Sequence, residues 1–467
     1  MTDLLVRGGT VVTPIGSHRA DVAVAGGRIE RVEPELGGLA ANTREVVDAT
    51  GLLVLPGVVD VHTHTRIATD EQPDRFFQDS AAAAFGGTTT FLAFNNPGTG
   101  ISAAVRGSLL AGFHEWRERT EHDSAIDYAV SLALTGQHED PVAELPAVVD
   151  EGVPTCKAFM IFDFRLPDAR LFAAMRALGA AGGMLEVHCE DPVLVDAAVT
   201  AALQRGNTSA RYHAGTRSVE AEAVATHRAL AFARQADAPV YVVHLSSEAA
   251  LRQVREAKVA GVRACAETCP HYLALDVSRY DAADDIDVAS VLITPPLRPA
   301  TDRDALWAGL AAGDLDLIAS DHVPDRLDTE KAEVLAGTPF DRVSNGAPGI
   351  ETLLAVAYSE GVATGRITVE RLVDLLSATP ARLFGLTHKG AVEPGRDADL
   401  VLFDPTPHST FRAADLHHTS DYTPYEGRER RGAVRSVFVR GRAVIRDGRF
   451  VGQRGFGRFV ERSTPDA

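Results

Sequence analysis

Two histidines, His62 and His64, follow an apolar run that extends from residue 52 to residue 61. Residues two apart on a strand point to the same side of a sheet. Two same-facing imidazoles at the end of an apolar strand are either ordinary strand-end residues or ligands of a metal ion. Taken alone, the pair is a weak signal for a metal. Its meaning therefore depends on what the other strand ends carry.

Four later apolar segments contain or end in groups that bind metals or protons, namely Lys157, His188, His244 and Asp321. A buried ammonium group is costly unless it is paired or neutralised, so Lys157 inside an apolar strand needs a special reason. Each group alone also has an ordinary explanation, as a hydrogen-bonded histidine or a paired lysine. Their joint occurrence with the first pair, on five strands in all, favours one shared metal site.

The stretch that carries these groups, residues 55–385, alternates short apolar segments with Ala- and Leu-rich helical segments. We identify eight strand candidates: residues 58–61, 89–94, 126–134, 153–159, 184–188, 240–245, 262–266 and 315–320. This alternation predicts an α/β fold with a parallel sheet. Eight repeats predict a (β/α)8 TIM-like barrel, with an open doubly wound sheet as the alternative. In a barrel, the carboxyl ends of all strands meet at one face, which would bring the five groups together.

The two ends of the chain have a different texture, with short alternating strands separated by glycine turns. We predict that residues 1–54 and 386–450 form one small β-sandwich and that residues 55–385 form the inserted barrel domain. Residues 451–467 are predicted to be a C-terminal tail, whose glycines and aromatic residues would suit an arm lying on a neighbouring subunit.

Bulk properties exclude several classes of partner. The 467 residues are 45% hydrophobic and 24% charged, and the net charge of −18 would repel nucleic acids and anionic membranes. No run of about 18 apolar residues is present, so no membrane span is expected. The first residues do not resemble a signal peptide. The four cysteines form no CxxC pair and lie in apolar surroundings, which predicts reduced core residues of a cytoplasmic protein.

Longer motifs add a resemblance that covers nearly the whole chain. The sequence resembles the amidohydrolase superfamily and, within it, the hydantoinase/dihydropyrimidinase family, in residues 55–64, 213–223, 267–273, 295–298, 345–351 and 394–402. The resemblance implies an enzyme that hydrolyses the C–N bond of a hydantoin, a dihydropyrimidine or a related cyclic ureide. The product would be the ring-opened N-carbamoyl amino acid or ureide. Relatives of this type assemble as homotetramers or dimers.

The same resemblance implies a centre of two divalent metal ions. His62 and His64 would hold one ion together with Asp321. His188 and His244 would hold the other ion. Lys157, carbamylated by CO2, would bridge both ions. Zinc suits these ligand types, although manganese, iron and cobalt also accept them. Asp321 would be the catalytic group that takes a proton from water and passes it to the leaving nitrogen. Backbone groups of Thr294 and Asn345 would bind the ring.

Two departures from the family pattern affect the predicted substrate. Phe162 stands where the family usually has a tyrosine, and phenylalanine cannot donate a hydrogen bond to an oxyanion. Arg66 resembles the arginine of dihydroorotases that reads a carboxylate, and Asn96 falls near the asparagine that assists it. The alternative for Arg66 is a surface ion pair with Asp70, Glu71 or Asp74.

These departures lead to the hypothesis of a cyclic ureide substrate with a polar or anionic substituent. An allantoinase or a dihydroorotase-like enzyme is the alternative, although Asp325 stands where dihydroorotases have a histidine that reads the anion. A non-enzymatic scaffold protein is a further alternative, against which every ligand position is filled.

Overall fold

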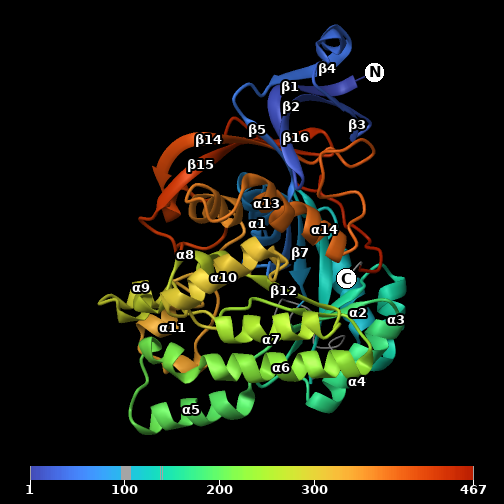
Figure 1. The fold of residues 1–467 in the computed structure, drawn as a ribbon. Helices are drawn as coiled ribbons and strands as arrows, with labels where there is room; N and C mark the ends of the chain where they lie inside the picture. The colour runs from blue at the N-terminus through green and yellow to red at the C-terminus, as the bar shows by residue number, and fades with distance from the viewer. Residues whose placement is uncertain (1, 96–106, 137, 139, 466–467) are drawn as a thin grey trace.

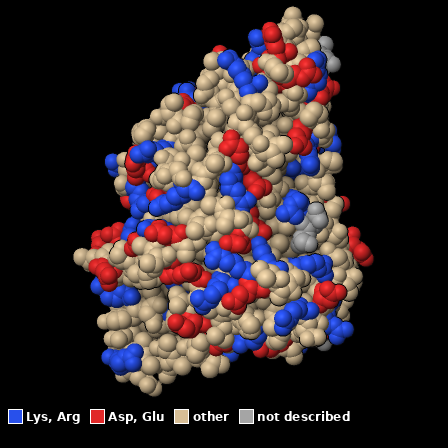
Figure 2. Space-filling model, viewed as in Figure 1, with Lys and Arg blue, Asp and Glu red and all other residues tan. Residues whose placement is uncertain are grey.

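The computed structural model describes residues 2–95, 107–136, 138 and 140–465. Two sheets organise this part of the chain. The strands from both chain ends lie together at the top of Figure 1, and the strands of the middle of the chain lie below them within a layer of helices. Basic and acidic side chains are interspersed over the face shown in Figure 2, so the net negative charge is not gathered in one region of that face.

The central sheet consists of eight parallel strands, adjacent in the order of the sequence. They are β6 (Val58–Thr63), β7 (Thr88–Phe94), β8 (Asp127–Leu134), β9 (Thr155–Phe159), β10 (Met184–His188), β11 (Val240–Val242), β12 (Ala264–Thr268) and β13 (Leu317–Ile318). The first strand meets the segment after the last one, because Thr63 forms a parallel bridge with His322 and His64 N–H donates to His322 O at 2.7 Å. The predicted (β/α)8 barrel is therefore confirmed, and the open-sheet alternative is wrong.

Helices follow the strands around the barrel. The crossover connections contain α1 (Arg75–Phe85), α2 (Leu109–Thr120), α3 (Pro141–Asp150), α4 (Asp168–Ala180), α5 (Pro192–Gln204), α6 (Val219–Ala236), α7 (Glu248–Val259), α8 (Pro270–Ala274), α9 (Asp285–Ala289) and α10 (Ala300–Ala312). After β13 come α11 (Ala332–Leu335), α12 (Leu353–Ala357), α13 (Val369–Val373) and α14 (Thr379–Leu383). Local sequence sets their ends: Ser218 Oγ caps α6 by accepting from Ala221 N–H, and Gly313 ends α10 with φ +85°. Among the described residues, no helix combines the length and apolar character that crossing a bilayer requires.

The barrel is filled by side chains. Leu92, Met184 and Tyr241 from three different strands belong to one buried apolar cluster that also contains Leu383 and Phe384 at the end of α14. A closed eight-stranded barrel has an interior just wide enough for side chains, so the barrel acts as a packed core. This core gives the strand ends a rigid base.

The second sheet has nine strands drawn from both chain ends. They are β1 (Thr2–Thr13), β2 (Gly16–Ala25), β3 (Arg28–Glu33), β4 (Thr43–Asp48), β5 (Leu53–Pro56), β14 (Leu400–Thr410), β15 (Glu429–Val439), β16 (Arg442–Arg446) and β17 (Arg449–Phe450). The two ends join where β14 pairs antiparallel with β5, with Val401 opposite Leu55. Apolar residues such as Val22 and Leu400 share one core. The prediction that both chain ends join in one β unit is thus confirmed, and the unit is a single nine-stranded sheet.

The C-terminal segment packs on its own barrel. Arg458 O accepts from Tyr128 N–H at 3.0 Å, and Val460 N–H donates to Tyr128 O at 2.8 Å, so the segment pairs with the start of β8. Phe459 packs against Tyr128 with ring centroids 5.9 Å apart. The Arg462 side chain is 5% exposed and donates from Nη2 to Val130 O at 2.6 Å. A segment predicted from its composition as a tail therefore contributes to the base of the barrel.

Candidate metal centre and substrate cavity

A cavity of about 550 Å³ opens at the carboxyl ends of the barrel strands. Side chains from β9, β10 and the segments that follow β6, β11 and β13 line it together with residues of two later loops. The structure thus gathers the sequence-predicted residues His64, Arg66, Lys157, Phe162, His188, His244, Thr294, Asp321 and Asn345 in one cavity wall. His62 lies just beneath them and is fully buried. Asn96, also predicted as a substrate contact, lies outside the described residues.

The Asp321 carboxylate lies between the two histidines of β6. Its Oδ1 is 3.0 Å from His62 Nε2 and 3.2 Å from His64 Nε2. Lys157 Nζ approaches the same His62 nitrogen at 3.4 Å. Burial opposes the charge of Asp321, but the hydrogen bonds from both histidines and the charge of His62 hold the pKa of Asp321 well below its usual range. The carboxylate is therefore ionised and able to accept a proton or bind a cation.

The other two histidines face each other across the cavity floor, with ring centroids 4.5 Å apart. His188 Nε2 shares a 2.8 Å hydrogen bond with Glu190 Oε2. His244 Nδ1 is buried and has no hydrogen-bond partner among the described residues. Burial lowers the pKa of His188. Burial also lowers the pKa of His244, and the charge of the neighbouring His188 lowers it further. Both rings are therefore neutral, which is the form that binds metals.

This donor set fits a divalent metal ion. One ligand atom each from His62, His244 and Asp321 lies within 4.8 Å of the other two. Imidazole nitrogens and a carboxylate oxygen are the ligand types that zinc prefers. An unpartnered ring nitrogen in a buried polar cluster is otherwise unfavourable. The arrangement is what a bound cation would stabilise.

Three of the seven described non-glycine residues with positive φ border this cavity. His244 has φ +36°, Asp321 has φ +48° and Phe162 has φ +75°, values that residues other than glycine rarely adopt. Such conformations cost on the order of 1–3 kcal/mol each and persist where the surrounding structure enforces them. Here they turn three strand-end side chains into the cavity.

Lys157 is fully buried on β9, where aromatic rings and the ionisable groups of the site surround its amine. Its Nζ lies 4.7 Å from the ring centroid of Phe94 and 5.4 Å from that of Phe159. Burial lowers the pKa of Lys157, with nearby carboxylates acting in the opposite direction. A neutral amine is a nucleophile that can add to CO2, so this environment is compatible with the carbamate that the family resemblance implies.

Glu267 on β12 fixes the orientation of His62, a role that was not predicted from the sequence. Its Oε1 accepts from His62 Nδ1 and from His244 N–H, the latter at 3.0 Å, and its Oε2 accepts from Tyr241 OH at 2.6 Å. Carboxylates that bind the second nitrogen of a metal-ligating histidine set its tautomer and orientation. The available signal was the same as for Lys157, a charged residue inside an apolar strand.

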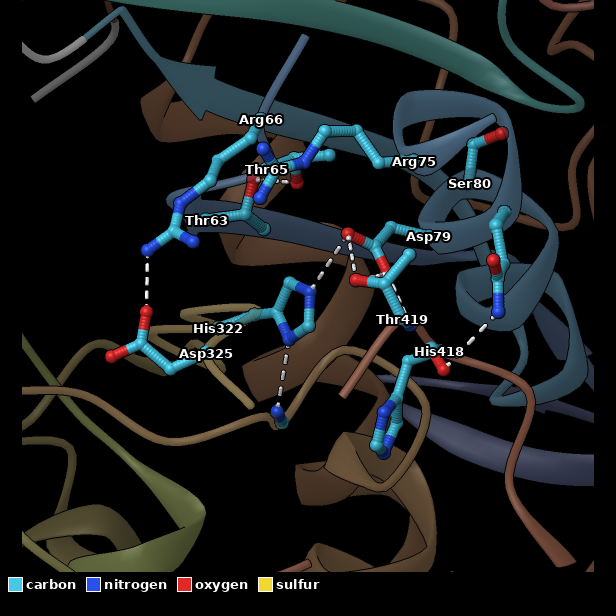
Figure 3. A network of polar contacts seen from close by, with 12 residues as sticks. Thr63, Thr65, Arg66, Arg75, Asp79, Ser80, His322, Asp325, His418 and Thr419 are labelled. Atoms are coloured by element: carbon cyan, nitrogen blue, oxygen red, sulfur yellow. Dashed lines mark hydrogen bonds and ion pairs between the residues drawn. The ribbon is translucent and has the colours of Figure 1, made fainter. Parts of the chain in front are cut away.

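A second buried network supports the segment that follows Asp321, as Figure 3 shows. His322 accepts at Nδ1 from Gly349 N–H at 3.2 Å, which directs its Nε2 toward Asp79 of α1 at 3.5 Å. Asp79 Oδ1 also accepts from Thr419 N–H at 2.9 Å. The backbone of His322 pairs with Thr63 of β6, so this network connects α1 and the C-terminal part of the chain to the strand that bears the histidine pair.

The predicted substrate contacts form two different walls. Phe162 packs against Phe159, Phe164 and His188 and gives one wall an aromatic surface. On the other wall, Arg66 donates to Glu330 at 2.6 Å and pairs with Asp325, and neither partner is one of the acidic residues that the sequence suggested.

Thr294 and Asn345 lie side by side in the cavity, with Thr294 Oγ1 donating to Asn345 Oδ1 at 3.2 Å. This contact places both residues where they can meet a ligand.

Comparisons with known proteins agree with this geometry. The model of the amidohydrolase family matches residues 53–444. The D-hydantoinase of Streptomyces coelicolor is 35% identical over 468 residues, and the D-phenylhydantoinase of Escherichia coli K12 is 36% identical over 467 residues; each alignment covers 98% of both chains. The crystal structure of dihydropyrimidinase from Brevibacillus agri superposes with a TM-score of 0.93 at 37% identity and covers 100% of both chains. The chain therefore belongs to the amidohydrolase family, in its hydantoinase/dihydropyrimidinase branch.

Proposed function

We propose that this protein hydrolyses the C–N bond of a cyclic amide, a hydantoin, dihydropyrimidine or related cyclic ureide, and releases the ring-opened N-carbamoyl amino acid or ureide. The observation that carries the proposal is the convergence of the imidazole, lysine and carboxylate groups of five barrel strands on one cavity. Relatives named as hydantoinases over 98% of both chains support the substrate class.

The proposed metal ligands are those that the resemblance to the hydantoinase family implies, and the convergence supports them. His62 and His64 would hold one ion with Asp321, the two later histidines would hold the second, and the carbamate of Lys157 would bridge them. Zinc is the ion that we propose from the ligand types. When bound, the metal pair would polarise the substrate carbonyl and lower the pKa of water.

Residues of the chain would move the proton and orient the ring. Asp321, ionised and 3.2 Å from His64, would accept the proton of the attacking water and deliver it to the ring nitrogen as the C–N bond breaks. Thr294 and Asn345 would hold the amide edge of the ring, and the aromatic wall around Phe162 would exclude water from it. Phe162 cannot donate to the developing oxyanion, so slow turnover of ordinary hydantoins is expected.

The assembly, the cellular compartment and the domain bounds are also proposals. A homotetramer or dimer is the assembly that we propose, and four buried free cysteines support a reducing compartment such as the cytoplasm. The division into domains at residues 54, 385 and 450 is our interpretation of the two sheets. A dihydroorotase-like alternative is less favoured because the acidic partners of Arg66 already neutralise its charge.

The direct test is a turnover panel of 5-substituted hydantoins, dihydrouracil, allantoin and dihydroorotate with zinc-loaded protein. Ring opening of at least one of these compounds is expected, and Asp321→Asn should abolish it. Asp196→Asn, which changes an exposed residue of α5, is the matched control and should leave the rate unchanged. Hydrolysis that survives Asp321→Asn, or no ring opening by fully loaded wild type, would contradict the proposal.

A further inference from the structure

Arg75 is the first residue of α1, and its guanidinium lies at the cavity wall beside that of Arg66 (Figure 3). The side chain is 11% exposed. A cation at the N-terminus of a helix opposes the helix dipole, and a second guanidinium nearby adds repulsion. Burial and the charge of Arg66 accordingly lower the pKa of Arg75. The position is electrostatically unfavourable for the protein alone.

The nearby carboxylates do not satisfy this guanidinium. Arg66 takes Glu330 Oε1 at 2.6 Å, and Glu330 Oε2 accepts from Thr329 Oγ1 at 2.6 Å and from Arg326 N–H at 3.1 Å. Asp325 is fully buried, where one oxygen pairs with Arg66 and the other accepts from Ser344 Oγ at 2.6 Å. The acceptors of this wall are therefore already in use.

Arg75 keeps free donors as a result. Its Nη2 is 3.8 Å from Glu330 Oε1, which is too far for a hydrogen bond. Its Nε is buried and has no hydrogen-bond partner among residues 2–95, 107–136, 138 and 140–465. Of the two guanidinium groups of this wall, Arg66 is paired with Asp325 and Glu330, whereas Arg75 has no carboxylate oxygen of the described residues within hydrogen-bond distance.

We propose that Arg75 is a specificity residue that binds a carboxylate on the exocyclic substituent of the substrate. Arg66 is held in place by its two acidic partners and lies beside the position where this carboxylate would bind. A planar guanidinium binds a carboxylate through two parallel hydrogen bonds, and exclusion from water strengthens both. The aromatic wall of Phe159, Phe162 and Phe164 lines the rest of the same cavity and suits a flat ring. This inference rests on the proposed function and narrows its substrate to cyclic ureides with an acidic side chain.

The test compares hydantoin-5-acetate with its uncharged isostere, hydantoin-5-acetamide, in both turnover and calorimetric binding to zinc-loaded protein. Wild type should favour the acid about 10- to 100-fold, the range for a hydrogen bond to a charged group. Arg75→Gln should remove that preference while leaving the amide almost unchanged, and Arg75→Lys should keep part of it. Arg176→Gln, which alters an exposed arginine of α4 outside the cavity, is the control and should behave as wild type.

Calorimetry separates this inference from the proposed function. Preferential binding of the acid, combined with no ring opening of either compound or of any compound in the turnover panel, would refute the hydrolase activity and support the role of Arg75. Equal binding of acid and amide by wild type would overturn the inference even if both rings were opened. A preference that persists in both Arg75 variants would also overturn it, because another residue would then read the carboxylate.

Discussion

Replacement of Glu267 by glutamine tests whether the buried carboxylate beneath the cavity controls metal binding. Glutamine has the same shape, so its oxygen can still accept from His62 Nδ1 while its amide faces Tyr241 OH, which can rotate to accept. The change therefore removes the negative charge and little else. The tautomer and position of His62 are expected to loosen without collapse of the barrel.

The magnitude follows from the contacts that this carboxylate makes. Residues that orient a metal-ligating histidine are typically worth about 10- to 100-fold in metal affinity. That range corresponds to about 1.4–2.7 kcal/mol of binding free energy. Tyr241→Phe is the matched control, because it removes the 2.6 Å hydrogen bond to Oε2 and leaves the contact between Glu267 and His62 intact. We expect it to cost about 1 kcal/mol of unfolding free energy with a smaller effect on metal affinity.

The assay is competition for zinc between the protein and a chelator of known affinity, with circular dichroism as the check on folding. Glu267→Gln should release zinc at a 10- to 100-fold lower chelator concentration than wild type. Unchanged zinc affinity in a folded Glu267→Gln protein would refute the reasoning. An equal loss in Tyr241→Phe would show that general loosening, and not the charge near His62, is responsible.

Three further predictions concern the surroundings of the site. Asp79→Asn should lower the unfolding free energy by about 1–3 kcal/mol, measured by urea titration. Burial opposes the charge of Asp79, but the neighbouring His322 side chain, 3.5 Å away, lowers the pKa of Asp79. The stabilising contribution of Asp79 is therefore lost only as pH falls below about 4, and the stability deficit of the variant should shrink there. A deficit independent of pH would contradict this role. Phe162→Tyr should raise kcat on uncharged hydantoins, by at most about 10²- to 10³-fold, whereas an unchanged kcat would mean that this position does not face the oxyanion. Burial raises the pKa of Cys189 and Cys265 to about 12, so native protein at pH 8 should not react with a thiol reagent until it is unfolded, and rapid labelling of the native protein would disprove their burial.

Most of the fold could be predicted from the sequence because each repeat leaves a local signal. Apolar segments of strand length separated by helical segments predicted the eight barrel strands, each within a few residues of its bounds. The closure of the barrel depends on the bridge between Thr63 and His322, which are far apart in the chain. The packing of Arg462 at the barrel base was missed because its polar sequence gives no sign of the partner, the backbone of Val130.

Some residues of the candidate site could be predicted from the sequence, whereas the roles of others depend on tertiary contacts. His62, His64 and Lys157 stand out because their residue types are unusual in or beside apolar strands. The roles of Glu267 and Asp79 depend on contacts between distant strands and helices, which spacing cannot predict. The pairing of Arg66 with residues more than 250 positions away also needed the folded chain, since the sequence pointed only to its acidic neighbours.

The most direct test of the central claim is the rate of hydantoin ring opening during removal and return of metal. Ring opening by wild type should disappear when a chelator removes the metal, and it should return as zinc is added back to the same sample in the presence of bicarbonate. Lys157→Ala, treated in the same way, should stay inactive throughout. Ring opening that continues after complete metal removal, or full activity of Lys157→Ala, would contradict a metal-dependent hydrolase built on these strand ends.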